Sequence, residues 1–217
     1  MEMQTNQATV PQQPDNHWKY WLQIWTQPRK TMREILDQPT NESHVLLLLL
    51  LGGFVYALNQ ASMRNAADDT SLVLMFVTII IATLIGAAIY YYIIGGILYW
   101  VGTLLGGAGE YGDVRLAIAY SYIPAAVTIL LWIPSIILFG SDNFTTETPK
   151  LDSSAGLSLI YLIFAVIELA IGIWGIFIFL KCLGEAHQFS AWLALLTVVL
   201  PIIGFVVLIA VLFMVIL

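Results

Sequence analysis

Charged residues are scarce in this sequence, and long apolar runs take their place. Asp, Glu, Lys and Arg make up 10% of the 217 residues, whereas 59% are hydrophobic and the mean hydropathy is +0.86. A soluble domain of this length could not bury so much apolar surface, so lipid must solvate part of it. The composition therefore excludes a soluble globular protein and indicates an integral membrane protein.

Cysteine and histidine are too few and too scattered for a metal site. The single cysteine, Cys182, excludes an internal disulfide and a cysteine-based cluster. His17, His44 and His187 lie far apart with no H-x3-H pairing. The glycines of GTLLGGAG (residues 102–109) lack the preceding strand and the following lysine of a phosphate-binding loop. We expect no metal, no cofactor, no nucleic-acid partner and no catalytic residue, and hence a protein that is not an enzyme.

Five apolar segments are predicted to cross a membrane, of which the first is short, because a hydrocarbon core of about 30 Å takes about 20 helical residues. They span residues 44–60, 71–105, 115–140, 155–180 and 190–217. The sequence thus predicts an all-α polytopic membrane protein with a five-helix transmembrane domain over 44–217. Ahead of it, residues 1–17 are polar and rich in Pro and Gln, which predicts a disordered tail.

The second segment is long enough to raise the question of two crossings. It contains no charge and no polar turn sequence, and unpaired backbone groups in lipid are costly. We therefore predict one long helix that tilts and runs past the inner surface. Tyr90, Tyr91 and Tyr92 then lie near that surface, and Gly95-Gly96 is the expected kink.

The distribution of basic residues predicts the orientation. With five crossings, one side of the membrane holds six of the eight basic residues, namely Lys19, Arg29, Lys30, Arg33, Arg115 and Lys181. The other side holds only Arg64 and Lys150, among several acidic residues. By the positive-inside rule, the N-terminus is cytoplasmic and the C-terminus external.

Residues 18–38 are predicted to form two short amphipathic helices at the cytoplasmic interface. Aromatic residues recur at three- and four-residue intervals, and Pro28 suits the first turn of a second helix. An interfacial helix needs rings in the headgroup layer and cations beside anionic lipid headgroups. The residues that supply them are Trp18, Trp21 and Trp25, followed by Arg29, Lys30 and Arg33. An alternative, compatible with the first, is that the two helices pack beneath the bundle as a lid.

Glu168 lies in the apolar stretch FAVIELAIG, near the middle of the fourth segment. An acidic residue at that depth costs about 2.5–3.5 kcal/mol, and no basic residue lies within a span to pair with it. We expect a protonated carboxyl that bonds hydroxyls or carbonyls freed by Pro124 and Pro201. The candidate hydroxyls belong to Tyr120, Ser121, Thr128 and Thr197. Two hypotheses stay open, a neutral acid that joins helices and a proton-linked or cation-binding site in a wet cavity.

The connection EYGDVRLAIAYSYIP adds a second group of polar residues on the cytoplasmic side. It contains Glu110, Asp113, Arg115, Tyr120, Ser121 and Tyr122 ahead of Pro124, and Glu185 occupies a similar place after the fourth segment. Pro124 frees a carbonyl about one turn earlier, so the segment forms either a polar notch or a plain proline kink. Small residues four apart, such as Ala117 and Ser121, favour close helix packing within the chain, with a homo-oligomer seam as the alternative.

Three stretches together resemble the Yip family (Ypt/Rab-interacting membrane proteins), in the form of its bacterial members. They are IWTQPRKTMREILDQ, EYGDVRLAIAYSYIPAAV and IWGIFIFLKCLGEAHQFSAWLALL, within residues 18–205. The resemblance implies a five-helix membrane bundle with a cytoplasmic N-terminus. Eukaryotic members act in vesicle traffic with Rab GTPases, but this chain lacks the DLYGP-like motif of their N-terminal regions. Binding of a Rab-type GTPase is therefore not expected.

Two functions follow from these observations. The leading hypothesis is a non-enzymatic integral protein of a bacterial plasma membrane that organises lipid or protein partners at the cytoplasmic face. The alternative is a small transporter, channel or lipid-translocating protein that uses polar residues around Glu168.

Overall fold

The computed structural model describes residues 18–216, so the predicted tail at 1–17 lies outside the described residues. The described chain is helical: α1 (Trp18–Gln23), α2 (Pro28–Leu36), α3 (Glu42–Met63), α4 (Leu72–Ala88), α5 (Gly95–Leu104), α6 (Tyr111–Ser121), α7 (Ile123–Val127), α8 (Ile129–Phe139), α9 (Pro149–Asp152), α10 (Ala155–Ala186) and α11 (Ala191–Ile216), with a π-helical segment η1 (Ile89–Ile94) and a 3-10 segment η2 (Gly140–Phe144). Within it, five helices are long and apolar enough to cross a membrane. This confirms the predicted all-α fold with five spans.

Three of the five spans begin at a polar residue that caps the helix. The side chain of Asn41 accepts a hydrogen bond from His44 N, that of Ser71 from Leu74 N, and that of Ser154 from Leu157 N. Such a cap pairs one of the amide groups left open in the first turn. Spans one, two and four therefore start within two residues of the positions expected from the apolar runs.

The third span starts earlier than expected, at Tyr111 rather than 115, because its polar residues form the helix cap. Asp113 Oδ2 accepts a hydrogen bond from the Glu110 amide at 2.9 Å, and the Glu110 side chain accepts one from the third helical residue. This reciprocal capping box joins the polar connection to the helix. The fourth span ends later than expected, at Ala186 rather than 180, so Glu185 belongs to the helix.

The second span is one continuous helix from Leu72 to Leu104, as predicted. Its irregular part is the π-helical segment η1, which lies immediately before the expected kink at Gly95-Gly96. A π-helical turn is wider than an α-helical one, and such turns recur at functional sites. The segment carries Tyr90, Tyr91 and Tyr92.

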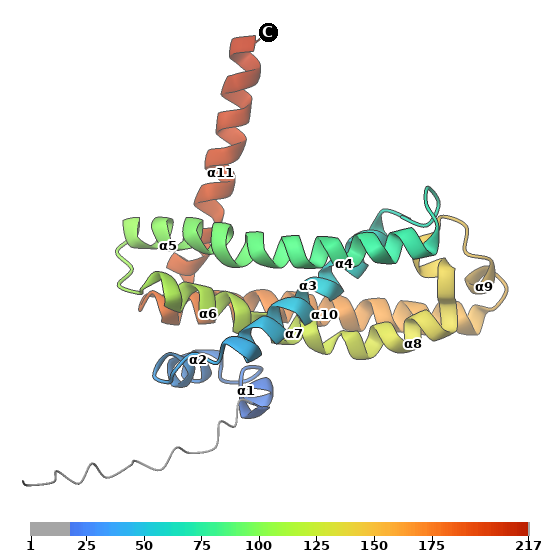
Figure 1. Ribbon diagram of the computed structural model, residues 1–217, viewed down its shortest axis with the longest axis horizontal. Helices are drawn as coiled ribbons and strands as arrows, with labels where there is room; N and C mark the ends of the chain where they lie inside the picture. The colour runs from blue at the N-terminus through green and yellow to red at the C-terminus, as the bar shows by residue number, and fades with distance from the viewer. Residues whose placement is uncertain (1–17, 217) are drawn as a thin grey trace, which may run out of the picture.

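Four of the long helices pack together, and the fifth leaves them. Figure 1 shows α4–α5, α6–α8 and α10 running side by side, with α3 crossing them obliquely and α11 projecting away. Ala194 and Thr197, near the start of α11, are buried, whereas its residues from Ile202 to Met214 are exposed. The five-helix bundle implied by the resemblance is thus a four-helix bundle with α11 attached through its first turns.

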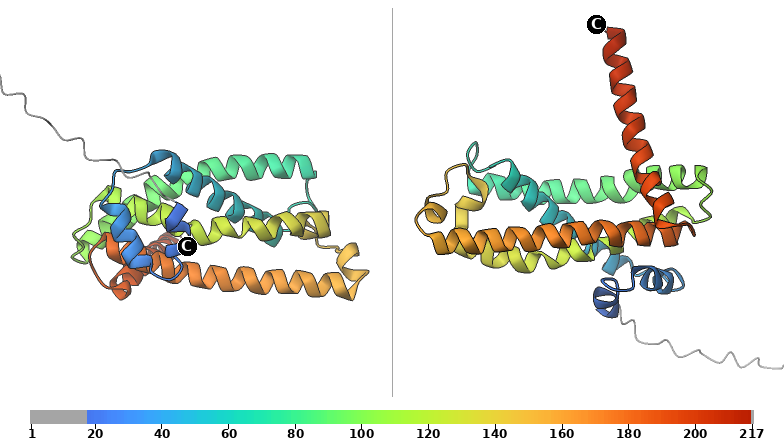
Figure 2. Two further views of the ribbon diagram at one scale, coloured as in Figure 1. Left: turned by 90° about the horizontal axis from the view of Figure 1, so that it is seen from below. Right: turned by 180° about the vertical axis from the view of Figure 1, so that it is seen from behind.

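The connections divide between two ends of the bundle (Figures 1 and 2). The α2 end holds α1, α2 and the connections 105–110 and 187–190, whereas the α9 end holds the connections 64–71 and 140–154. The six basic residues of the orientation argument belong to segments at the α2 end, and Arg64 and Lys150 to segments at the α9 end. The fold therefore preserves the charge asymmetry on which the predicted orientation rests.

Candidate functional site

Helices α1 and α2 pack beneath the bundle at the α2 end. Ile24 and Met32 are fully buried and belong to the largest core cluster, together with residues of α3, α6 and α10. Trp18 and Leu22 are instead exposed, by 66% and 79%, although the Trp18 ring still lies 6.2 Å from the His44 ring, centroid to centroid. The predicted tryptophan face is thus divided, because Trp21 and Trp25 pack against the core and Trp18 does not. The two helices therefore pack beneath the bundle as a lid, which is the second arrangement considered from the sequence. Trp18 and Leu22 form an apolar edge on the outside of this lid.

An ion cluster fastens α2 to the end of α10. Arg33 contacts Glu185 Oε1 through Nη2 at 2.6 Å and through Nε at 2.7 Å, and Arg29 Nη1 lies 3.5 Å from Glu185 Oε2. Arg29 Nη2 also donates to the Phe189 carbonyl at 2.7 Å. The Glu185 side chain is only 9% exposed, and a buried carboxylate is stable when cations and hydrogen bonds surround it. Two of the three cations expected to face lipid therefore hold the lid in place.

The remaining basic residues of the lid differ in their pairing. Lys19 Nζ contacts Glu34 Oε2 at 3.0 Å, and this hydrogen bond raises the pKa of Lys19. Lys30 is exposed and forms no ion pair within residues 18–216. Lys30 is thus the cation of α2 that stays open to an outside anion.

A hydrogen-bonded chain that the sequence analysis did not identify links α1, α3 and α6. Trp21 Nε1 donates to His44 Nε2 at 3.0 Å, and His44 Nδ1 lies 3.1 Å from the Tyr120 hydroxyl. Because Nε2 accepts, the proton of a neutral His44 is on Nδ1 and is donated to Tyr120. Tyr120 therefore joins the lid rather than an intramembrane notch.

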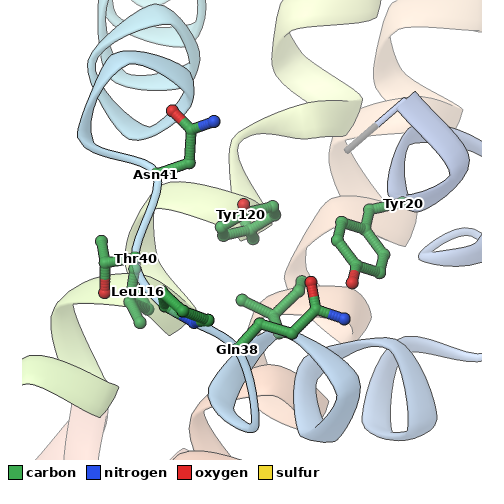
Figure 3. Close-up of a pocket in the computed structure, with 8 residues that line it drawn as sticks. Tyr20, Gln38, Thr40, Asn41, Leu116 and Tyr120 are labelled. Atoms are coloured by element: carbon green, nitrogen blue, oxygen red, sulfur yellow. The ribbon is translucent and has the colours of Figure 1, made fainter. Parts of the chain in front are cut away.

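A small pocket opens beside this chain, between the 37–41 connection and α6. Figure 3 shows Tyr20 and Tyr120 near Gln38, with Asn41 at the start of α3. The pocket has a cavity volume of about 10 Å³, which is about the space that one water molecule needs, so it is too small for an organic substrate.

The glycine-rich connection packs tightly against His187. The Ala108 amide donates to the His187 carbonyl at 3.0 Å, and a Cβ added to Gly102 would lie 2.2 Å from His187 Nε2. His187 is 1% exposed, stacks on Phe189, and has no hydrogen bond at either ring nitrogen in the described chain. Burial lowers the pKa of His187. Gly102, Gly107 and Gly109 thus allow close packing against Ala186 and His187, whereas Gly106 has a positive φ of 88° and no neighbour within 4 Å of an added Cβ.

The predicted hydrogen bonds to Glu168 do not form. Ser121, Thr128 and Thr197 donate to carbonyls of their own helices, at 2.7, 2.7 and 2.9 Å. Glu168 is half-buried and forms no hydrogen bond within residues 18–216. Hydroxyls in helices readily bond the carbonyl three or four residues earlier in the same helix, and this local bond replaces the expected bond to another helix.

The other intramembrane candidates serve packing. Pro124 lies against Gly175 of α10, where a glycine Cβ would be 3.7 Å from the proline Cβ, and the Tyr122 ring fills the space beside Gly52 of α3. Pro201 lies inside α11. No group of three His, Cys, Asp or Glu side chains that could hold a metal occurs among the described residues.

The last group of polar residues lies at the start of α6. Glu110 and Asp113 form the cap described above, and Arg115 lies among the rings of Tyr91, Tyr92 and Tyr111. The structure therefore separates the predicted cytoplasmic face into a lid, an ion cluster, a histidine-glycine contact and an arginine held by tyrosines.

Comparisons with known proteins agree with this architecture. The family model of the Yip1 domain matches residues 22–213, from the end of α1 to near the end of α11. A search of the curated proteins found no match, and neither did a search of the solved structures. The matched range covers most of the chain. It includes the first four membrane-spanning helices completely and the fifth up to residue 213. The chain therefore belongs to the Yip1-domain family, and it is an integral, multi-pass membrane protein.

Proposed function

We propose that this protein is non-enzymatic and that it holds lipid or protein partners at the cytoplasmic face of a bacterial plasma membrane, through the outer edge of α1–α2. The observation that carries the proposal is the exposure of Trp18 and Leu22 on a helix that is otherwise fixed to the bundle. A fixed element that keeps two large apolar side chains outside the core has a surface suited to the membrane interface.

The position of the lid along the bundle axis supports a location at the membrane–water interface. Trp174 Nε1 of α10 donates to the Trp25 carbonyl at 3.0 Å. The helix from Ala155 to Trp174 is about 30 Å long at 1.5 Å per residue, which is one hydrocarbon thickness. Trp25 and Trp174 then lie where the acyl chains end, in the layer that tryptophan rings prefer. Lys30, beyond them, is available to anionic headgroups.

Site-directed spin labelling tests the position of α1. Cys182 is buried, so a cysteine introduced at Leu22 can be labelled selectively in the full-length protein reconstituted in vesicles. We expect a label at Leu22 to be protected from a water-soluble relaxation agent and exposed to oxygen. A label at exposed Gln38 is the control and should show the opposite ratio. Equal accessibility to the water-soluble agent at both positions would contradict the proposal.

Reporter fusions test the proposed orientation separately. A reporter that is active only in the cytoplasm should be silent after Leu217 and active when inserted near Gly112. A bright fusion after Leu217 would place both termini on the same side and overturn the proposed topology.

A transporter, channel or lipid-translocating role is the second candidate function, and Glu168 favours it. A half-buried carboxyl within a span, six residues before Trp174 and without a hydrogen bond in the described chain, is a functional-site hypothesis by default. Ion flux and lipid scrambling, measured with the same vesicles, test this role. Flux that Glu168→Gln abolishes at unchanged protein stability would support transport over the organising role, and no flux above empty vesicles would exclude it.

A further inference from the structure

Three tyrosine rings surround the guanidinium group of Arg115. Its Cζ lies 4.6 Å from the ring centroid of Tyr111, 4.9 Å from that of Tyr91 and 5.5 Å from that of Tyr92. All three distances are within the range of a cation–π contact. Arginine stacks on aromatic faces with its planar fork of donors, so the rings restrict both the position and the plane of the group.

The backbone around Arg115 is arranged to build this cage. Two of its rings come from consecutive residues of η1, where the wider π-helical turn replaces an α-helical one. The Tyr111 hydroxyl donates to the Tyr92 carbonyl at 2.8 Å and ties the start of α6 to η1. Gly95 leaves room for the arginine stem, since a Cβ there would lie 3.2 Å from Arg115 Cγ.

No carboxylate oxygen of residues 18–216 lies within 4.0 Å of a nitrogen of Arg115. Arg115 forms no ion pair or hydrogen bond there, and its Nε is buried without a hydrogen-bond acceptor. The acidic residues next to it in sequence are engaged elsewhere, because Glu110 and Asp113 cap α6. The two Nη groups of Arg115 also make no hydrogen bond in the described chain, and unlike Nε they are not buried. Their donors suit an anion that accepts two parallel hydrogen bonds, such as a phosphate.

The depth of the cage matches that of lipid phosphates. The helix from Leu72 to Tyr92 is about 30 Å long at 1.5 Å per residue, so the tyrosines lie where one hydrocarbon thickness ends. Tyr92 is exposed on the outside of the bundle. Arg115, packed against the next turn at Gly95, then lies in the headgroup layer.

We propose that Arg115, held by Tyr91, Tyr92 and Tyr111, binds the phosphate group of a membrane lipid headgroup. The guanidinium supplies the charge and the fork of donors, and the three rings keep the fork directed while lipids exchange. The site lies on η1 and α6 and uses neither Trp18, Leu22 nor Lys30, so it goes beyond the proposed role of the lid.

Lipid binding to the full-length protein in a neutral detergent tests the site, with native mass spectrometry as the readout. The probes are phosphatidylglycerol, a diacylglycerol with the same chains but no phosphate, and inorganic phosphate as a competitor. Arg115→Gln should weaken phosphatidylglycerol binding by about tenfold, as expected for a lost charge-assisted hydrogen bond. Arg64→Gln, which removes the same charge at the α9 end, is the matched control and should bind as the unmodified protein does.

Two further variants separate the cage from simple charge. Arg115→Lys keeps the charge but loses the planar fork, so it should also bind phosphatidylglycerol more weakly. Tyr92→Leu removes one exposed ring and keeps the arginine, so it should weaken phosphatidylglycerol binding severalfold. This variant still tests the site in the event that Arg115→Gln does not fold. Diacylglycerol binding should be the same in all variants. Competition by inorganic phosphate would show that the phosphate alone is recognised, and its absence would show that the lipid is required.

Equal phosphatidylglycerol binding in Arg115→Gln and Arg64→Gln would overturn the site, as would equal binding in Tyr92→Leu and the unmodified protein. The lid has an independent variant, Trp18→Ser with Leu22→Ser, which leaves the cage unchanged. If lipid binding depends on Arg115 but the spin label on α1 is found in water, the proposed function of the lid is wrong and the phosphate site stands.

Discussion

The indole N–H of Trp21 donates to Nε2 of His44 at 3.0 Å and joins the first short helix to the first membrane span. The other ring nitrogen of His44 pairs with the Tyr120 hydroxyl of the third span. One buried imidazole therefore connects three segments that are distant in sequence. This connection keeps Trp18 and Leu22 on the outside of the lid.

Replacing His44 with Leu should loosen the lid. The change leaves the Trp21 N–H and the Tyr120 hydroxyl without this partner in a buried site, at a cost of about 1–3 kcal/mol. We expect a lower midpoint of thermal unfolding in detergent and a more mobile spin label at Leu22. Trp21→Phe removes only the donor and should give a smaller loss. Additive losses in the double variant would show that the two residues are not coupled.

Replacing Glu185 with Gln should destabilise the contact between α2 and α10. It leaves Arg29 and Arg33 without their shared carboxylate, and because both arginines are partly exposed we expect a loss of about 1–2 kcal/mol. Glu34→Gln, in the partly exposed pair with Lys19, is the control and should change stability by less than about 0.5 kcal/mol, because the Glu34 carboxylate is more exposed than that of Glu185. Thermal unfolding at low and high salt measures both. An equal effect of the two variants would place Glu185 among ordinary surface charges.

Adding a methyl group to Gly102 should disturb the packing of the glycine-rich connection. The new Cβ would lie 2.2 Å from His187 Nε2, so we expect Gly102→Ala to cost about 1–3 kcal/mol. Gly172→Ala in α10 is the matched control, because nothing lies within 4 Å of its added Cβ. That change should be neutral or stabilise the helix by about 0.5–1 kcal/mol. Similar unfolding midpoints for the two variants would contradict the close contact.

Acid should weaken the same contact through His187. Its pKa in the folded protein is lowered from the ordinary value of 6.5 by burial, so the unfolded chain takes up the proton first. The stability that neutral His187 contributes is present above about pH 6.5 and is lost as the pH falls from there toward the folded pKa. His187→Gln cannot titrate, so its unfolding midpoint should fall less than that of the unmodified protein between pH 7.5 and 5. If the unfolding midpoints of His187→Gln and the unmodified protein fall equally with pH, His187 is not the group that causes the loss of stability.

The sequence could predict the spans because the information for them is local. An uninterrupted apolar run of sufficient length requires a helix in lipid, and Ser71 and Ser154 mark helix starts by their own side chains. Local chemistry also explains the early start of the third span. Glu110 and Asp113 suggest a loop by their charge, but their spacing of three is that of a capping box.

The site depended on contacts that no local pattern contains. His44 and His187 stand alone in the sequence, and their environments come from α1 and α6 in one case and from the glycine-rich connection in the other. The hydroxyls expected near Glu168 are the opposite case, because they bond carbonyls only three or four residues earlier, and this local contact replaces the expected bond between helices.

Apolar composition by itself determined that this chain is helical and crosses a membrane five times, because lipid leaves the backbone few other ways to pair its polar groups. Only the tertiary structure decided that Arg29 and Arg33 bind Glu185, while Arg115 lies among three tyrosine rings and forms no ion pair with a carboxylate of residues 18–216. The physical reason is that a cation binds the groups carried by the helices that pack around it at its own depth in the membrane. That meeting depends on packing between segments more than a hundred residues apart, as it does for Arg33 and Glu185.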